Sequence, residues 1–246
     1  MRYIFLLLGC LLFSFVNQID FLTEQKKYTR VRTAITEKEI LLKDKLNTWG
    51  LEPNNLHILF VAYKDDDILE VYGKRKSEEN YKKLFSYAIC SRSGKLGPKR
   101  KEGDGQVPEG FYLINRFNPV SNFYLSLGLN YPNLSDKRKS VATKLGGDIF
   151  IHGGCVTIGC LPMTDDKIKE IYLLAAYAKN NGQSQIPIYI FPFQMTDNIM
   201  LTFRNRYADN PNLISFWENL KTGYDIFQRD KKALRIQVKE NGDYTF

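Results

Sequence analysis

The pattern of apolar and polar residues predicts a series of β-strands through the middle of this 246-residue chain. Leu56–Tyr63 is almost entirely apolar, Asp65–Asp67 follows it, and Ile68–Tyr72 is again mostly apolar. We therefore expect a β-hairpin with a solvated aspartate turn. Three adjacent aspartates also suit a metal ion, but no further ligand spacing follows them. More strands are predicted at residues 81–90, 111–114, 121–129 and 186–193.

Helices are predicted on both sides of these strands. Apolar residues recur near the 3.6-residue period over Phe21–Trp49, and Gly50 then gives a stop signal. A second helix is predicted at Asp165–Asn180, where Thr164 can cap the first turn. One or two closing helices are expected within Asp197–Leu220. The sequence therefore predicts a mainly β, mixed α+β fold with flanking helices.

The N-terminus predicts export. We divide the chain into a secretory signal peptide at 1–18, an N-terminal helix at 19–50, a central domain at 51–195 and a C-terminal helical extension at 196–246. Arg2 precedes about 14 mostly apolar residues, which is typical of an export signal and shorter than a membrane-spanning helix. Leu7–Cys10 has the spelling of a lipidation box, so a lipoprotein and an uncleaved membrane anchor remain alternatives.

The net charge bears on the class of binding partner, and the cysteine count bears on the presence of a free thiol. The formal charge of +8 suits nucleic acid, an acidic membrane surface or an acidic wall polymer. Export argues against nucleic acid, and we expect membrane contact only through the signal or a lipid anchor. Export also places Cys90, Cys155 and Cys160 in an oxidising compartment, where one disulfide among the three would leave one free thiol.

The candidate chemistry lies in Gly147–Thr164, GDIFIHGGCVTIGCLPMT. His152 follows an apolar run, as at the end of a strand that feeds a loop, and Cys160 lies eight residues further on. An imidazole that reaches a thiol can activate it as a nucleophile. The alternatives are a buried cysteine in a glycine-rich turn and, less well supported, a metal site of His152, Cys155 and Cys160. The other histidine, His57, is a rival base for Cys160.

A long segment between Cys90 and Phe111 is rich in glycine, proline, lysine and arginine. It contains no G-x-x-x-x-G-K-[ST] phosphate loop. It is therefore either a basic surface loop or, since loops of this length usually carry function, a loop that faces the substrate. The charged cluster Asp136–Lys139 is expected to be solvated.

Four strings occur in order within residues 56–193: ICSRSGKLGPKRKEGDGQVPEGFY, FYLSLGLNYPN, IFIHGGCVTIGCLPMTDDKI and IPIYIFPF. Together they resemble the bacterial L,D-transpeptidases with a YkuD-type catalytic domain, and specifically their YafK-like branch. The resemblance implies that 51–195 is a β-rich catalytic domain, that Cys160 is the nucleophile and that His152 is the general base.

The resemblance also implies supporting roles for the backbone. The carbonyl group of Gly153 would orient the imidazole, and the N–H groups of Ile158, Gly159 and Cys160 would form the oxyanion hole. Compared with the better-known branch, this chain has a shorter gap within the motif and Ile158 in place of a histidine. These differences leave the acyl acceptor open.

The implied reaction is acyl transfer on peptidoglycan stem peptides in the periplasm, through a Cys160 thioester, with neither a metal nor an organic cofactor. An amine acceptor would make a cross-link or attach a protein to the wall. Water would instead make the protein a hydrolase of the same bond, including one that releases a wall-linked lipoprotein. The competing class is a non-catalytic wall-binding module in which Cys160 is structural. No substrate-binding residues are identified.

Overall fold

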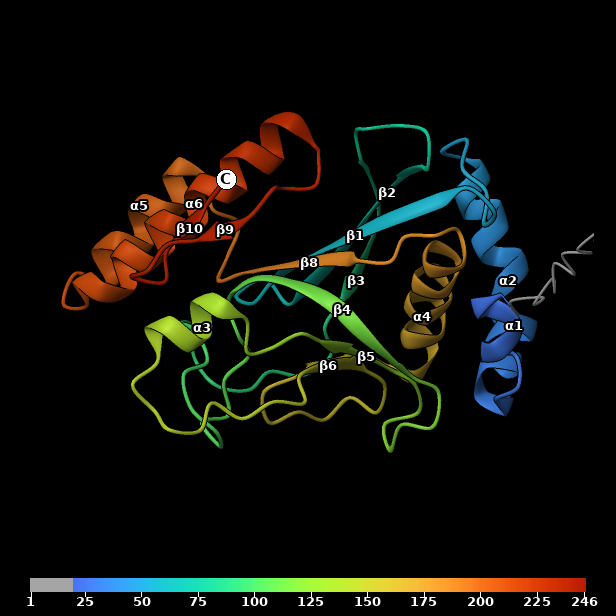
Figure 1. Ribbon diagram of the computed structural model, residues 1–246, viewed down its shortest axis with the longest axis horizontal. Helices are drawn as coiled ribbons and strands as arrows, with labels where there is room; N and C mark the ends of the chain where they lie inside the picture. The colour runs from blue at the N-terminus through green and yellow to red at the C-terminus, as the bar shows by residue number, and fades with distance from the viewer. Residues whose placement is uncertain (1–19) are drawn as a thin grey trace, which may run out of the picture.

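An eight-stranded mixed sheet lies at the centre of the protein, whose computed structural model describes residues 20–246 (Figure 1). The predicted signal peptide at 1–18 lies outside the described residues. The strand order is β3-β2-β1-β8-β4-β5-β6-β7. The pairs β1–β8 and β6–β7 are parallel, and the other neighbours are antiparallel. The strands are β1 Leu56–Tyr63, β2 Ile68–Arg75, β3 Lys82–Ala88, β4 Gly110–Asn118, β5 Ser126–Leu129, β6 Phe150–His152, β7 Leu161–Pro162 and β8 Ile186–Phe191.

Strand β1 is buried on both faces, which explains its nearly continuous apolar sequence. Ile58 and Phe60 belong to one core cluster, whereas Leu59 and Val61 belong to another. Successive side chains of a strand point to opposite faces, so the two clusters lie on opposite sides of the sheet. Helix α4 (Asp165–Asn180) contributes to the first cluster and the C-terminal helices contribute to the second.

Three helices pack together on one side of the sheet, at the right of Figure 1: α1 (Phe21–Gln25), α2 (Thr29–Asn47) and α4. The prediction of a single helix over Phe21–Trp49 is therefore wrong. The guanidinium group of Arg32 donates hydrogen bonds to the carbonyl oxygens of Lys26 and Lys27, at 2.9 and 2.7 Å. A side chain thus binds these two carbonyl groups, and the chain turns between α1 and α2 at this point.

The predicted helix Asp165–Asn180 is confirmed as α4 with the same bounds. The hydroxyl of Thr164 accepts a hydrogen bond from the backbone N–H of Lys167 at its first turn.

The C-terminal part of the chain covers the opposite face of the sheet. It comprises α5 (Asp197–Arg206), α6 (Pro211–Asp230) and a small hairpin of β9 (Gln237–Val238) and β10 (Tyr244–Thr245). The prediction of one or two closing helices is confirmed, although the second helix continues past Leu220. Trp217 of α6 is fully buried against the ring of Phe193, with centroids 5.2 Å apart.

Strand β5 is shorter than the predicted strand Ser121–Leu129. Arg30 of α2 donates hydrogen bonds to the carbonyl oxygens of Ser121 and Tyr124. Tyr124 also has a positive φ of 69°, which an extended strand does not contain. The first half of this alternating segment is therefore a turn held by α2.

The prediction that the charged cluster Asp136–Lys139 is solvated is wrong for Asp136, which is only 1% exposed, whereas Lys137 and Arg138 are exposed. These residues lie in a short helix, α3 (Leu134–Lys139). Asn133 and Asp136 form a capping box at its start, in which each side chain accepts a hydrogen bond from the other's backbone N–H.

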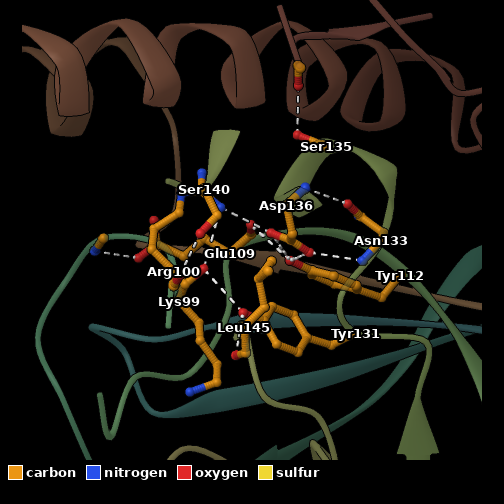
Figure 2. A network of polar contacts seen from close by, with 12 residues as sticks. Lys99, Arg100, Glu109, Tyr112, Tyr131, Asn133, Ser135, Asp136, Ser140 and Leu145 are labelled. Carbon is orange, nitrogen blue, oxygen red and sulfur yellow. Dashed lines mark hydrogen bonds and ion pairs between the residues drawn. The ribbon is translucent and has the colours of Figure 1, made fainter. Parts of the chain in front are cut away.

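Figure 2 shows that Asp136 also joins the basic loop to the sheet. Its carboxylate lies 3.0 Å from a guanidinium nitrogen of Arg100 and 3.0 Å from the hydroxyl of Tyr112 in β4. Ser140 donates a second bond to this loop, from its hydroxyl to the carbonyl oxygen of Arg100 at 2.6 Å. Burial raises the pKa of Asp136 to about 6, because it outweighs the stabilisation that these hydrogen bonds give to the carboxylate.

The predicted mainly β, mixed α+β class with flanking helices is confirmed. Across residues 20–246, no helix combines the length and the apolar character that a membrane span needs.

Candidate active site

His152 is the last residue of β6 and Cys160 directly precedes β7, the neighbouring strand at one edge of the sheet. The parallel register of these two strands pairs Ile151 with Leu161 and His152 with Pro162. Cys160 directly precedes β7, so this register places it beside Phe150, two residues before His152 on the adjacent strand. The seven residues between His152 and Cys160, together with Cys160 itself, form the loop that connects the two strands.

The imidazole of His152 is held by its own neighbour in the chain. Its Nδ1 atom lies 2.6 Å from the carbonyl oxygen of Gly153, and its ring packs on that of Phe123 with centroids 4.6 Å apart. Because a carbonyl oxygen only accepts hydrogen bonds, Nδ1 carries the proton and Nε2 presents its lone pair. Burial lowers the pKa of His152, although the bond to Gly153 opposes this effect. The ring is therefore neutral at neutral pH.

Gly153 occupies a position with no room for a side chain. A Cβ atom there would lie 2.5 Å from Oδ1 of Asp165 and 2.8 Å from the carbonyl oxygen of Phe123. The N–H group of Gly153 donates to the carbonyl oxygens of Phe123 and Leu125, at 3.0 and 3.2 Å. The carbonyl group that faces His152 is therefore fixed in place by close packing.

Cys160 is the free cysteine of the described residues. Its Sγ atom lies 3.6 Å from the carbonyl oxygen of Asp148, and within residues 20–246 no hydrogen bond joins it to His152. Burial raises the pKa of the Cys160 thiol, and the nearby Asp148 carboxylate adds to this effect. At neutral pH the site therefore holds a neutral thiol and a neutral imidazole.

Thr157 organises the loop that carries the thiol. Its Oγ1 atom accepts hydrogen bonds from the N–H groups of Gly159 and Cys160, at 3.2 and 2.8 Å, and donates one to the carbonyl oxygen of Cys160, at 3.0 Å. Two of the three N–H groups expected to form the oxyanion hole thus already have a partner. The side chain of Ile158, between them, is 89% exposed.

A disulfide between Cys90 and Cys155 fastens this loop to the chain that leaves β3. Backbone hydrogen bonds from Cys90 to Pro162 and from Cys155 to Met163, at 3.0 and 3.3 Å, support the same connection. Because Cys155 is oxidised, the alternative metal site of His152, Cys155 and Cys160 is wrong. Across residues 20–246, no group of His, Cys, Asp and Glu side chains is arranged to hold a metal ion.

A cavity of about 290 Å³ opens beside Cys160. The basic segment after Cys90 forms much of its wall, as the substrate-facing interpretation of that segment requires. The turn between β1 and β2, the last residue of α5 and the residue after it contribute other parts of the lining. The lining comprises Lys64, Asp65, Asp67, Ile89, Ser91, Arg92, Ser93, Gly94, Lys95, Leu96, Val107, Cys160, Leu161, Arg206 and Tyr207.

The basic segment is anchored by the buried carboxylate of Glu109, which is 0% exposed. Glu109 accepts hydrogen bonds from Lys64 at 3.0 Å, from the backbone N–H of Gly97 at 2.7 Å and from the indole N–H of Trp217 at 2.9 Å. The segment also touches the thiol loop, since a Cβ atom on Gly159 would lie 3.0 Å from the carbonyl oxygen of Gln106. The wall of the cavity is thus fixed to the core and to the loop of Cys160.

Comparison with known proteins gives the same family as the motifs. The L,D-transpeptidase catalytic domain model, YkuD, matches residues 56–190. The protein named "Putative L,D-transpeptidase YafK" from Escherichia coli (strain K12) is 39% identical over 184 residues, which are 74% of this chain and 70% of that protein. Its counterpart in Escherichia coli O157:H7 gives the same values. The chain belongs to the L,D-transpeptidase family.

Solved structures with a similar fold include the helical cell shape determining protein Pgp2 of Campylobacter jejuni, with a TM-score of 0.44 and 21% identity over 76% of this chain and 74% of that one. Bd1075 of Bdellovibrio bacteriovorus has a TM-score of 0.40 and 25% identity over 70% and 62% of the two chains. The identity to YafK, together with the matched catalytic domain, places this chain in the YafK-like branch of the family.

In this member of the L,D-transpeptidase family, His57 does not line the cavity beside Cys160. It belongs to β1 and lines a separate cavity together with residues of β4, β8 and the C-terminal segment. Burial and the nearby Lys74 lower its pKa. The geometry therefore gives no support to His57 as the base for Cys160.

Some residues at the site lie outside the sequence motifs that identify the family. Arg206 and Tyr207 reach the cavity from α5, outside the segment that the L,D-transpeptidase model matches, and no local pattern marks them. The hydrogen bonds of Thr157 do have a local signal, because a threonine two and three residues before free N–H groups commonly accepts from them. The buried network around Asp136 has no such signal, since its partners lie far away in the sequence.

Proposed function

We propose that this protein is a cysteine acyltransferase that acts on peptidoglycan stem peptides, with Cys160 as nucleophile and His152 as general base. One observation carries the proposal: a free thiol lies beside the strand of a histidine whose Nδ1 proton is committed to a carbonyl group. That arrangement leaves Nε2 as the proton acceptor that a thiol nucleophile needs. The family supports the substrate class.

The first step transfers a proton and forms a thioester. Both groups are neutral at rest, because burial raises the pKa of the Cys160 thiol and lowers that of His152. The thiol turns from the Asp148 carbonyl group about its Cα–Cβ bond, Nε2 takes its proton, and sulfur attacks the carbonyl carbon of the stem residue. The carbon–nitrogen bond then breaks, and the imidazolium of His152 returns the proton to the leaving amine.

The tetrahedral intermediate carries a negative oxygen that the loop of Cys160 can stabilise. The N–H groups of Gly159 and Cys160 donate hydrogen bonds to Thr157 Oγ1, whereas the N–H of Ile158 does not. Those two N–H groups would share their hydrogen bonds with the oxyanion or exchange one partner for the other. Each well-placed donor contributes about 3 kcal/mol to the transition state.

The acyl acceptor decides between two outcomes at one site. An amine that attacks the thioester carbon releases the thiol and gives a new amide, whereas water gives a free acid. The second outcome makes the protein an L,D-carboxypeptidase or endopeptidase, or an enzyme that releases a wall-linked lipoprotein. A non-catalytic wall-binding module is the weaker alternative, because it needs neither the free thiol of Cys160 nor the oriented ring of His152.

Export to the periplasm completes the proposal. Residues 1–18 would act as a cleaved export signal. The alternatives are that this segment directs lipid attachment or stays uncleaved as a membrane anchor. Residues 51–195 would form the catalytic domain and 196–246 a helical extension. The Cys90–Cys155 disulfide supports an oxidising compartment, since such bonds are rare in the cytosol.

The proposal is tested by incubating the full chain with muropeptides that carry tetrapeptide stems and following product masses, with Cys160→Ala as the blank. Cross-linked dimers or exchanged terminal residues that the blank lacks identify a transpeptidase. Shortened or unlinked products identify a hydrolase. A protein that is as inert as its Cys160→Ala variant on free and lipoprotein-linked muropeptides is not an enzyme of this class.

A further inference from the structure

Two cations in the lining of the cavity beside Cys160 have no acidic partner. Lys64 and Arg92 pair with Glu109 and Asp67, at 3.0 and 2.5 Å. Within residues 20–246, Lys95 and Arg206 form no ion pair, although both line the same cavity. An unpaired lysine and an unpaired arginine at the rim of a cavity attract an anion.

Both cations stand on fixed parts of the chain. The guanidinium group of Arg206 lies over the ring of Phe203, 4.7 Å from its centroid, and that ring stacks on Phe193 in the core. The backbone N–H of Lys95 donates to the side-chain oxygen of Gln106 at 2.8 Å. The guanidinium group of Arg206 in α5 and the backbone of Lys95 in the basic loop are therefore both fixed beside the cavity.

Ser93, in the same lining, adds an independent observation. Its Oγ atom is buried and has no hydrogen-bond partner in the described chain. A buried hydroxyl without a partner is uncommon, because its desolvation is not compensated. A ligand oxygen in the cavity would supply the missing partner once the Ser93 side chain turned toward it about its Cα–Cβ bond.

We propose that Lys95, Arg206 and Ser93 form a carboxylate subsite beside the nucleophile, which binds a free carboxylate of the stem peptide and sets its position relative to Cys160. This identification of the carboxylate rests on the proposed function. Arginine binds carboxylates in two parallel hydrogen bonds, and lysine adds a point charge. The other acidic side chains of the lining, Asp65 and Asp67, contact Arg92 and leave the two cations available.

The first test needs no peptidoglycan. Iodoacetate and iodoacetamide alkylate the same sulfur atom and differ mainly in charge, so the ratio of their rates reports an anion subsite. The rates are measured on the full chain at low salt, with modification of Cys160 read by peptide mass spectrometry. The variant is Lys95→Gln with Arg206→Gln. The matched control is Lys82→Gln with Arg204→Gln, which removes the same charge from positions outside the lining.

We expect the Lys95→Gln, Arg206→Gln variant to slow iodoacetate roughly tenfold and to change the rate of iodoacetamide by less than about twofold. The control should leave the ratio of the two rates near that of the natural sequence. A variant whose ratio equals that of the control overturns the subsite.

The second test identifies the carboxylate. KM is compared for a tetrapeptide stem, for the same peptide with an amidated terminus and for one with amidated internal carboxylates. We expect one amidation to raise KM roughly tenfold in the natural sequence and to have little effect in the Lys95→Gln, Arg206→Gln variant. Equal KM values for all three peptides overturn the assignment to the stem peptide. A protein that turns over no peptide but keeps its selectivity for iodoacetate has the anion subsite without the proposed function.

Discussion

The Nδ1 atom of His152 lies 2.6 Å from the carbonyl oxygen of Gly153, the next residue in the chain. A neutral carbonyl group thus takes the place that a carboxylate has beside the histidine of many hydrolases. It fixes the tautomer without adding a negative charge that would favour the imidazolium. The basicity of Nε2 therefore depends on burial and on the backbone position of Gly153, and not on a third side chain.

We expect Gly153→Ala to lower kcat/KM by at least tenfold, because the new Cβ atom would press on Asp165 and Phe123 and displace the carbonyl group from His152. Stability should fall by roughly 1–3 kcal/mol in chemical unfolding. The matched control is Gly147→Ala in the same segment, where no atom lies within 4 Å of the new Cβ. Equal activities for the two variants would contradict the role of the Gly153 carbonyl group.

The pH dependence of alkylation reports the resting state of the thiol. Burial raises the pKa of Cys160 above its ordinary value of 9.0, so the thiolate is scarce at neutral pH. We expect the rate with iodoacetamide to rise about tenfold per pH unit between roughly pH 6 and 9. His152→Ala should leave that slope unchanged. A plateau that begins below pH 7 would instead indicate a thiolate–imidazolium pair.

Thr157 should behave as a positioning residue of the nucleophile loop. Thr157→Val removes the acceptor of the Gly159 and Cys160 N–H groups, so we expect kcat to fall about tenfold with little change in KM. Thr157→Ser keeps the hydroxyl and should restore most of the activity. A Thr157→Val variant with a higher kcat would mean that the hydroxyl competes with the oxyanion.

Asp136 should contribute more to the stability of the protein at mildly acidic pH than at neutral pH. Its folded pKa of about 6 lies above the ordinary 3.8, so the folded protein binds this proton more tightly than the unfolded chain. The contribution is complete below pH 3.8 and is lost as the pH rises through about 6. We expect the unfolding free energy, relative to Asp136→Asn, to fall by roughly 2 kcal/mol between pH 4 and pH 7. A difference that stays constant with pH would show that Asp136 is ionised throughout.

Most strands could be predicted because their signal is local. The apolar run of β1 and the aspartate turn after it follow from residue order alone. The turn between α1 and α2 could not be predicted from periodicity, since it depends on where the guanidinium group of Arg32 binds. Asp136 was misjudged for a related reason: Tyr112 and Arg100 reach it from 24 and 36 residues away, and a charged cluster in sequence does not reveal such partners.

At the site, the motif string singled out His152, the last residue of β6, and Cys160, the residue before β7, and these two strands pair. The cysteine count indicated one free thiol, but it could not say which two of the three cysteines are joined, because that depends on how β3 and the loop meet. Arg206 follows Cys160 by 46 residues and comes from another layer of the fold. Only the packing of α5 places it near the thiol.

The hydrogen bond from the indole of Trp217 to the carboxylate of Glu109 connects the segment matched by the family model to helix α6. The matched segment stops at residue 190, yet the buried carboxylate of Glu109 within it depends on an indole N–H from α6. A chain cut after residue 195 would leave that carboxylate short of a donor and would uncover the aromatic cluster beneath α5 and α6. We therefore expect the smallest unit that folds to extend beyond the segment defined by sequence similarity, because the C-terminal helices help to shape the cavity beside Cys160.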